Sequence, residues 1–148
     1  MFENVEILQA ELQHYTSLYS ASNASLGLII ELYKPETKWR LIRYLQDNGH
    51  EAICIYGAGL IGKVLYDALI DSFHNIIVAD MSGCSIYDFK RGSIVTPENL
   101  SQYNIDCFIV TPARFYDEIE KSLTRMGLKN IYSLAAILAH MRFKDGGF

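Results

Sequence analysis

Short runs of apolar and β-branched residues alternate with helical patterns over the last two thirds of the chain. This alternation predicts an α/β domain in which a parallel sheet is covered by helices. The runs at 53–56 and 76–79 are continuously apolar, as is typical of strands with helices on both faces. The pattern predicts five strands and two intervening helices, with the strands at 52–56, 75–80, 93–95, 106–111 and 130–132 and the helices at 61–72 and 114–126.

The first fifty residues have a different pattern, with apolar or aromatic residues at spacings of three and four that predict helices. This seam consists of Val5, Leu8, Leu12, Tyr15, Tyr19, Ser22, Leu26, Ile29 and Tyr33. Weak helix formers at 20–25 favour two helices over one rod. The pair Lys34-Pro35 ends the seam, and Pro35 begins another helix with Trp39 expected on its apolar stripe.

A last helix is expected from a Ser133 cap through Arg142, with four apolar residues on one side that need cover. Either the N-terminal helices or a second subunit could provide that cover, so a homodimer through the N-terminal and C-terminal helices is one expectation. The domain organisation is thus a helical N-terminal extension at 1–50, followed by an α/β domain with its C-terminal helix at 51–148.

The turn between the first strand and the first helix of the α/β domain reads G-x-G-x-x-G, from Gly57 to Gly62. In this pattern the first glycine allows the turn, the second admits a pyrophosphate, and the third lets the helix pack closely on the strand. Amide groups at the start of the helix then face the anion. The next strand ends at Asp80, 18 residues after Gly62, where an acid can bind ribose hydroxyls and favours NAD over NADP.

These features predict a Rossmann-like parallel five-stranded sheet in the order 3-2-1-4-5. In that order the strand at 106–110 lies beside the first strand, at the switch point where ligands bind, and it is followed by Thr111 and Pro112. The same two residues also suit the start of the next helix. The candidate cofactor-binding residues are therefore Gly57, Ala58, Gly59, Leu60, Ile61, Gly62, Asp80, Thr111 and Pro112.

A second phosphate-binding pattern overlaps the first, because Gly57 to Lys63 also reads G-x-x-x-x-G-K. The next position is Val64, which lacks the hydroxyl that would hold magnesium, so an ATPase is rejected. Lys63 is instead expected on the exposed side of the first helical turn.

Charge and composition narrow the function classes. The 13 Lys and Arg against 17 Asp and Glu give a formal net charge of −4, which argues against nucleic-acid and membrane partners. The chain has neither an apolar run long enough to span a bilayer nor a secretory signal, and a cytoplasmic location is expected. The three cysteines and four histidines form no metal-ligand pattern, so no metal is predicted.

The segment from Glu51 to Tyr132 resembles the small Rossmann domains of bacterial polysaccharide-biosynthesis proteins. The stretches that carry the resemblance are Y-G-A-G at 56–59, T-P-E-N-L at 96–100 and G-L-K-N-I-Y at 127–132. Such domains form the amino-terminal part of sugar-nucleotide dehydratases and epimerases, and related subdomains accompany sugar acetyltransferases and methyltransferases. The resemblance implies NAD(P) or a nucleotide-sugar on the loop at 57–61, with Asp80 near a ribose.

The expected function is binding of NAD(H) or a nucleotide-sugar by a stand-alone or accessory module of surface-polysaccharide or sugar-nucleotide metabolism. No catalytic residue is assigned, because none of the ten tyrosines has the Lys four residues later that short-chain dehydratases need. One alternative is a sugar-nucleotide oxidoreductase, dehydratase or epimerase that completes its site in an oligomer, using Tyr87, Lys90 or Arg91. The other is an interaction domain with an empty site.

Overall fold

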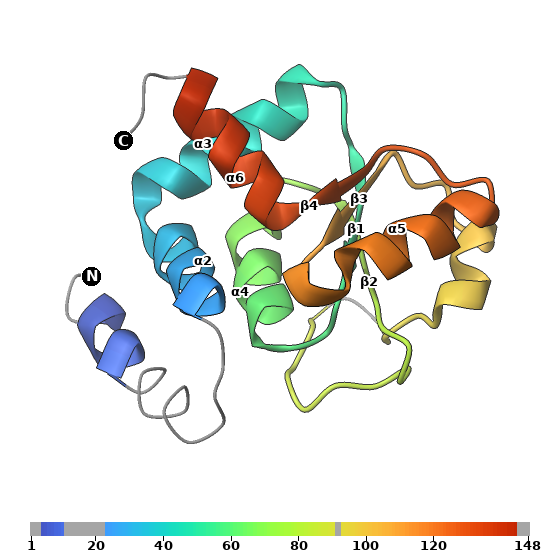
Figure 1. Cartoon of the computed structure of the whole chain (residues 1–148), viewed down its shortest axis with the longest axis horizontal. Coiled ribbons are helices and arrows are strands. Elements are labelled where there is room, and N and C mark those ends of the chain that lie inside the picture. Colours follow the sequence, from blue (N-terminus) through green and yellow to red (C-terminus); the bar gives the residue numbers. More distant parts are fainter. Residues whose placement is uncertain (1–3, 11–22, 91–92, 145–148) are drawn as a thin grey trace.

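The computed structural model describes residues 4–10, 23–90 and 93–144 of the chain (Figure 1). Residues 4–10 are helical. The further elements follow in the order α2 (Asn23–Tyr33), α3 (Pro35–Asp47), β1 (Ala52–Tyr56), α4 (Leu60–Leu69), β2 (Asn75–Ala79), η1 (Pro97–Gln102), β3 (Cys107–Val110), η2 (Ala113–Phe115), α5 (Tyr116–Arg125), β4 (Ile131–Ser133) and α6 (Leu134–Lys144).

The described part of the chain forms one sheet of four parallel strands in the order β2-β1-β3-β4. β1 is central and continuously buried from Ile53 to Tyr56, in agreement with the apolar run that predicted it. The sequence therefore predicted an α/β domain with a parallel sheet and helices, and the structure confirms this class. The carboxyl ends of β1 and β2 lie side by side, since Tyr56 pairs with Ala79.

The predicted five-stranded sheet in the order 3-2-1-4-5 is not confirmed. In place of the third strand at 93–95, the structure has a single bridge between Val95 and Ala79 of β2. The Val95 amide donates to Val78 O at 2.9 Å, and the Asp80 amide donates to Val95 O at 3.0 Å. Pro97 begins η1 two residues later, and because proline has no N–H, pairing cannot continue through it.

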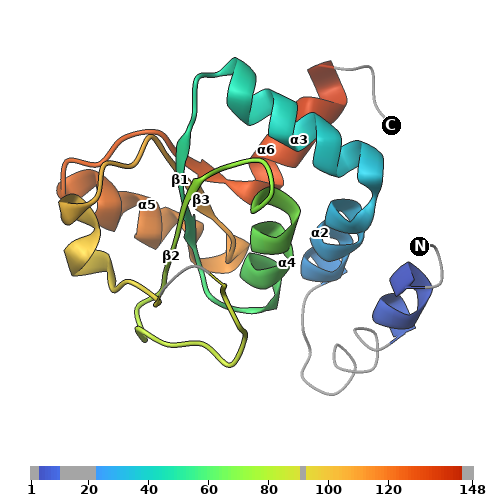
Figure 2. The ribbon, with the colours of Figure 1, turned by 180° about the vertical axis from the view of Figure 1, so that it is seen from behind.

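The sheet has an apolar cluster on each face because successive side chains of a strand point to opposite sides. Ile53 and Ile55 of β1 belong to a cluster with α2, α3, α4 and α6. Cys54 and Tyr56 belong to a second cluster on the other face, with Leu100 of η1 and residues of α5. In Figure 2, which shows the molecule from behind, α2, α3, α4 and α6 form a layer to the right of the strands and α5 lies to their left. The two layers hold the carboxyl ends of the strands in place.

The C-terminal helix is covered by this chain's own N-terminal helices. The four apolar residues of α6 are buried in the same cluster as Leu41 and Leu45 of α3. The Ala136 amide donates to Ser133 Oγ at 3.3 Å, which confirms the predicted cap. Because α3 covers this face, burial of α6 does not require a second subunit, and the homodimer stays a prediction.

The N-terminal helices follow their predicted pattern in part. α2 ends at Tyr33 and Pro35 begins α3, as predicted. Ile29 is buried as the seam requires, whereas Tyr33 is 40% exposed and Leu32 is buried in its place. Trp39 is 60% exposed, so its assignment to the apolar stripe of α3 was wrong. The remaining seam positions in the middle of the segment, Leu12, Tyr15, Tyr19 and Ser22, lie outside the described residues.

No helix in the described ranges is both long enough and apolar enough to cross a membrane.

Candidate functional site: the glycine turn after the first strand

The glycine-rich turn joins the carboxyl end of β1 to the start of α4, next to the end of β2. The Gly57 amide donates to Ala79 O at 2.8 Å, which ties the turn to β2. Gly57 has φ +118°, a conformation that side chains rarely permit. A Cβ at this position would lie closer than 3.0 Å to Thr111 Oγ1 and 3.0 Å from Pro112 Cδ. The first glycine is therefore required by the chain's own packing.

The third glycine of the motif is required for a different reason. A Cβ at Gly62 would lie closer than 3.0 Å to the carbonyl oxygen of Gly57 and 3.7 Å from a methyl carbon of Ile55. The first turn of α4 thus rests directly on the backbone of the turn and on β1. This is the close packing of helix on strand that the motif predicts.

The second glycine has no such structural requirement. Gly59 is exposed, its φ of −87° suits any residue, and a Cβ there would have no atom within 4 Å. Gly59 is the N-cap of α4, and the first intrahelical donor is Lys63, whose amide donates to Gly59 O at 3.0 Å. The amides of residues 60–62 therefore have no acceptor within the helix, as at any helix start. The backbone at Gly59 is open to an incoming group.

Asp80 lies directly after β2, and its carboxylate contacts the glycine turn. Oδ2 accepts a hydrogen bond from the Ala58 amide at 2.9 Å. Oδ1 accepts one from the Ser82 amide at 3.0 Å and one from the Ser82 hydroxyl at 2.8 Å. Partial burial raises the pKa of Asp80, but these hydrogen bonds together outweigh it and hold the pKa below its usual value. Asp80 is thus an anion at neutral pH.

The Asp80 contact corrects one expectation about the turn. The amides of Gly57 and Ala58 were predicted to bind phosphate, but they donate to Ala79 and Asp80 of the chain itself. An amide that already donates to a strong acceptor within the chain is a weak donor to a second acceptor. The amides that remain are those of residues 60–62, which have no acceptor within α4.

Because Asp80 has a lowered pKa in the folded chain, it stabilises the fold above its unfolded pKa of about 3.9. We expect this contribution to be lost as the pH falls through the lower folded pKa. Asp80→Asn should therefore unfold at lower urea concentration at pH 7, and its stability should fall less than that of the unsubstituted chain between pH 5 and pH 3. Urea titrations across this range measure both effects; equal acid-side losses in the two chains would show that Asp80 is not the group responsible.

The segment that follows Asp80 is held against the turn and α4. The Ser85 hydroxyl donates to Ala58 O at 2.6 Å. Lys63 Nζ donates to the carbonyl oxygen of Asp88 and pairs with Asp67 Oδ1 at 3.0 Å. The amine of Lys63, predicted on the exposed side of the helix, therefore anchors this loop.

The same loop contains the residues of the predicted oligomeric enzyme. Phe89 is buried edge-on against Tyr66 of α4, with ring centroids 5.1 Å apart. Tyr87 is half-buried against the main apolar cluster, Lys90 is exposed, and Arg91 lies outside the described residues. Packing accounts for Tyr87 and Phe89, and no catalytic arrangement emerges from the described side chains of this loop.

Thr111 and Pro112 lie beside the glycine turn, as the predicted position of their strand requires. Thr111 is buried, and its hydroxyl donates to Tyr56 O at 3.1 Å. It does not cap the next helix, because the N-cap of η2 is Pro112 and no side chain caps it. Thr111 occupies the space that a side chain at residue 57 would need. Its main role is therefore to shape the turn.

Sequence reasoning placed Ser82 in a loop that could line a pocket or cover the sheet edge, but it did not predict the hydrogen bonds by which Ser82 and Ser85 fix this loop. The pattern D-x-S at 80–82 is a signal that could have found the first of them, because an Asp side chain often accepts a hydrogen bond from the amide two residues later. No comparable local signal identifies Ser85, because its hydroxyl binds a carbonyl 27 residues away in the sequence.

The remaining chemically reactive groups give no catalytic centre. Within the described residues, no three His, Cys, Asp or Glu side chains could together hold a metal ion. Cys54 and Cys107 are buried in the sheet, and burial raises the pKa of the Cys107 thiol to about 12. A thiol in this state is a poor nucleophile. Cys84 is exposed in the loop after Asp80.

The fold and the turn together define a class of protein: a parallel α/β domain in which a glycine-rich strand-to-helix turn meets an acid at the end of the next strand. The family model described as C2185-like, N-terminal, matches residues 49–131, and the chain belongs to this family. The match includes β1, the glycine turn, Asp80 and Thr111. No curated protein and no solved structure matches the chain.

Proposed function

We propose that the chain binds a nucleotide, either NAD(H) or a nucleotide-sugar, at the glycine turn. The observation that carries this proposal is the contrast among the three glycines: packing requires Gly57 and Gly62, whereas no atom of the described residues lies within 4 Å of a Cβ placed on Gly59. A glycine with ordinary φ and open space is explained when a ligand's phosphate approaches the backbone there. The amides at the start of α4 would bind that phosphate.

Asp80 is the proposed ribose contact. A carboxylate has about four acceptor sites on its two oxygens, and the chain uses three of them in the bonds from Ala58 and Ser82. One acceptor site is left for a ribose hydroxyl. The negative charge of Asp80 disfavours a 2′-phosphate, which supports NAD over NADP.

The resemblance to small domains of polysaccharide-biosynthesis proteins supports a role as an accessory module of sugar-nucleotide metabolism in the cytoplasm. The described site would provide contacts to phosphate and ribose, and its described side chains include no acid–base pair beside them. The proposed activity is therefore binding, and any chemistry would depend on groups supplied by another protein.

Ligand-induced stabilisation tests the proposal. Thermal unfolding is followed with NAD, NADH, NADP, UDP-sugars and coenzyme A, each in excess. A ligand at one hundred times its Kd adds about 2.7 kcal/mol, which raises Tm by roughly 5–10 °C in a domain of this size. We expect this shift with NAD(H) or with a UDP-sugar, and a smaller one with NADP. If no member of the panel stabilises the chain, the proposal fails.

Gly59→Asp locates the ligand. Asp is a better N-cap than Gly and its Cβ enters open space, so the variant should fold at least as well as the unsubstituted chain. Its carboxylate would occupy the amides of α4 and repel a phosphate, so the ligand-induced shift should disappear. Gly59→Asn adds the same bulk without charge and should retain part of the shift.

Ser122→Asp adds the same charge on the exposed side of α5, far along the chain from the turn. This control should keep the full ligand-induced shift. If Gly59→Asp is stabilised by the ligand as strongly as Ser122→Asp is, the ligand binds elsewhere.

A further inference from the structure

A polar groove lies at the opposite edge of the sheet, where the strands begin. It consists of two hollows that share Glu51, His74 and Asn75. The larger has a volume of about 520 Å³ and extends to Tyr103 and Asp106; the smaller, of about 400 Å³, extends to His50. Volumes of this size suit a small ligand. The groove lies at the amino ends of the strands, whereas the glycine turn follows the carboxyl end of β1.

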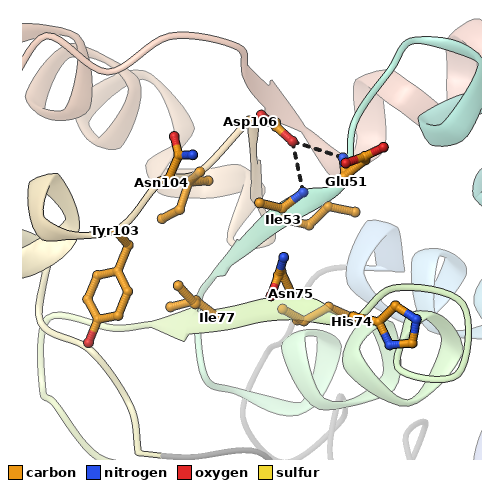
Figure 3. A pocket seen from close by; sticks show the side chains of 11 residues that line it. Glu51, Ile53, His74, Asn75, Ile77, Tyr103, Asn104 and Asp106 are labelled. Atoms are coloured by element: carbon orange, nitrogen blue, oxygen red, sulfur yellow. Dashed lines mark hydrogen bonds between the residues drawn. The ribbon is translucent and has the colours of Figure 1, made fainter.

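Two carboxylates, those of Glu51 and Asp106, line the larger hollow together with His74. Asp106 Oδ2 accepts hydrogen bonds from the amides of Glu51 and Ala52, both at 2.9 Å (Figure 3). Oδ1 of Asp106 and the Glu51 carboxylate form no ion pair or hydrogen bond with any described residue. Neither hollow is lined by a Lys or an Arg. The groove therefore has two negative charges and acceptor oxygens to spare.

The charge of Asp106 is secured by its surroundings. The amides of Ala52 and Glu51 lower the pKa of Asp106 most, burial opposes them, and His50 makes the last and smallest contribution by lowering it further. Carboxylates that line a groove concentrate ligands of the opposite charge. It also repels phosphates and carboxylates, so the groove is chemically unlike the glycine turn.

His50 provides a second, independent indication of a ligand. Its side chain is only 8% exposed, and the ring lies beside Tyr132 with centroids 6.0 Å apart. The imidazole forms no hydrogen bond or ion pair with any described residue, although it lines the smaller hollow. The ring nitrogens of His50 are not among the fully buried side-chain atoms that lack a partner in the described residues, so the imidazole is open to the hollow. An imidazole in this position can accept a hydrogen bond from a ligand N–H.

We propose that this groove binds a small organic cation with an ammonium or guanidinium group, held by Glu51 and Asp106 with His50 as a further acceptor. Ammonium and guanidinium groups have only donors, which match the unused acceptors of all three residues. A metal ion is a poorer match, because no three ligating side chains come together in the described structure.

Titration of the ¹⁵N-labelled chain with putrescine and with agmatine, followed by NMR, tests the proposal. We expect shifts concentrated at residues 50–52, 74–75 and 103–106, and none with 1,4-butanediol, which has the length of putrescine but no charge. Glu51→Gln should weaken binding by roughly tenfold, the scale of one charge-assisted hydrogen bond. Glu51 is exposed and its side chain has no partner among the described residues, so this variant should fold normally.

Glu118→Gln is the matched control, because it removes the same charge from an exposed position on α5. It should bind the amines as the unsubstituted chain does. Gly59→Asp should also bind them normally, which separates this site from the proposed nucleotide site. The proposal is overturned if no shifts occur at the groove, if butanediol produces the same shifts, or if Glu118→Gln weakens binding as much as Glu51→Gln.

Discussion

Gly62→Ala should lower the free energy of unfolding by about 3 kcal/mol, the upper part of the range for an over-packed site. The added methyl would lie closer than 3.0 Å to the carbonyl oxygen of Gly57, a backbone atom that cannot rotate away. Relief requires that α4 move away from β1 or that the turn itself shift. Alanine is a better helix former than glycine by about 1 kcal/mol. The expected loss of free energy of unfolding is the net value after this gain has been subtracted from the cost of over-packing. Urea denaturation measures it, and Tm should fall by roughly 6–12 °C.

Gly27→Ala is the matched control for this prediction. Gly27 lies inside α2, has an ordinary φ, and has no atom within 4 Å of an added Cβ. The same substitution there should stabilise the chain by about 0.5–1 kcal/mol. If Gly62→Ala and Gly27→Ala have the same effect on unfolding, α4 does not rest on the turn as the structure has it.

The central strands could be predicted from sequence because their burial is continuous. β1 occupies the predicted residues, Ala52–Tyr56, and β2 ends one residue before the predicted Asp80. An apolar run bounded by a glycine turn has few other ways to bury its side chains. The same reasoning failed at 93–95, where the run is short and Pro97 follows closely, so the loss of one donor reduces a strand to a single bridge.

The candidate site was predictable in its composition but not in its hydrogen bonds. The motif correctly brought the glycine turn and Asp80 together, since both follow neighbouring parallel strands. The motif could not show that Asp80 accepts a hydrogen bond from the Ala58 amide, because the sequence does not determine which donors bind a carboxylate. The motif also assigned a different role to each of its three glycines, and the coordinates agree for Gly57 and Gly62, which packing requires. The approach of a ligand to Gly59 stays a prediction.

Tertiary contacts also decided the role of Thr111. Its position after β3 was compatible with a ligand contact and with a helix cap. The actual partner of its hydroxyl is Tyr56 O, 55 residues earlier in the sequence. No local pattern encodes a contact of that separation, and it arises from the parallel pairing of β1 with β3.

Gly57→Ala should be at least as damaging as Gly62→Ala, with an expected loss of about 4 kcal/mol that combines over-packing with backbone strain. The strain arises because φ at residue 57 is +118°. The over-packing arises because the methyl would meet Thr111 Oγ1. These two causes can be separated, because Thr111→Ala removes the hydroxyl but leaves φ unchanged.

A double-mutant cycle makes that separation. Thr111→Ala alone should lower the free energy of unfolding by about 1 kcal/mol, because the hydrogen bond from the Thr111 hydroxyl to Tyr56 O is lost. The Tyr56 carbonyl is not left without a donor, because it still accepts a hydrogen bond from the amide of residue 111 at 3.0 Å. The double variant should be more stable than the sum of the two losses predicts, by about 1–2 kcal/mol, as is usual for residues in contact. Gly57→Ala with the distant Ser122→Ala should be additive. Additivity for Thr111 as well would mean that backbone strain and the contact with Pro112 make glycine necessary at residue 57, and that the hydroxyl of Thr111 does not shape the turn.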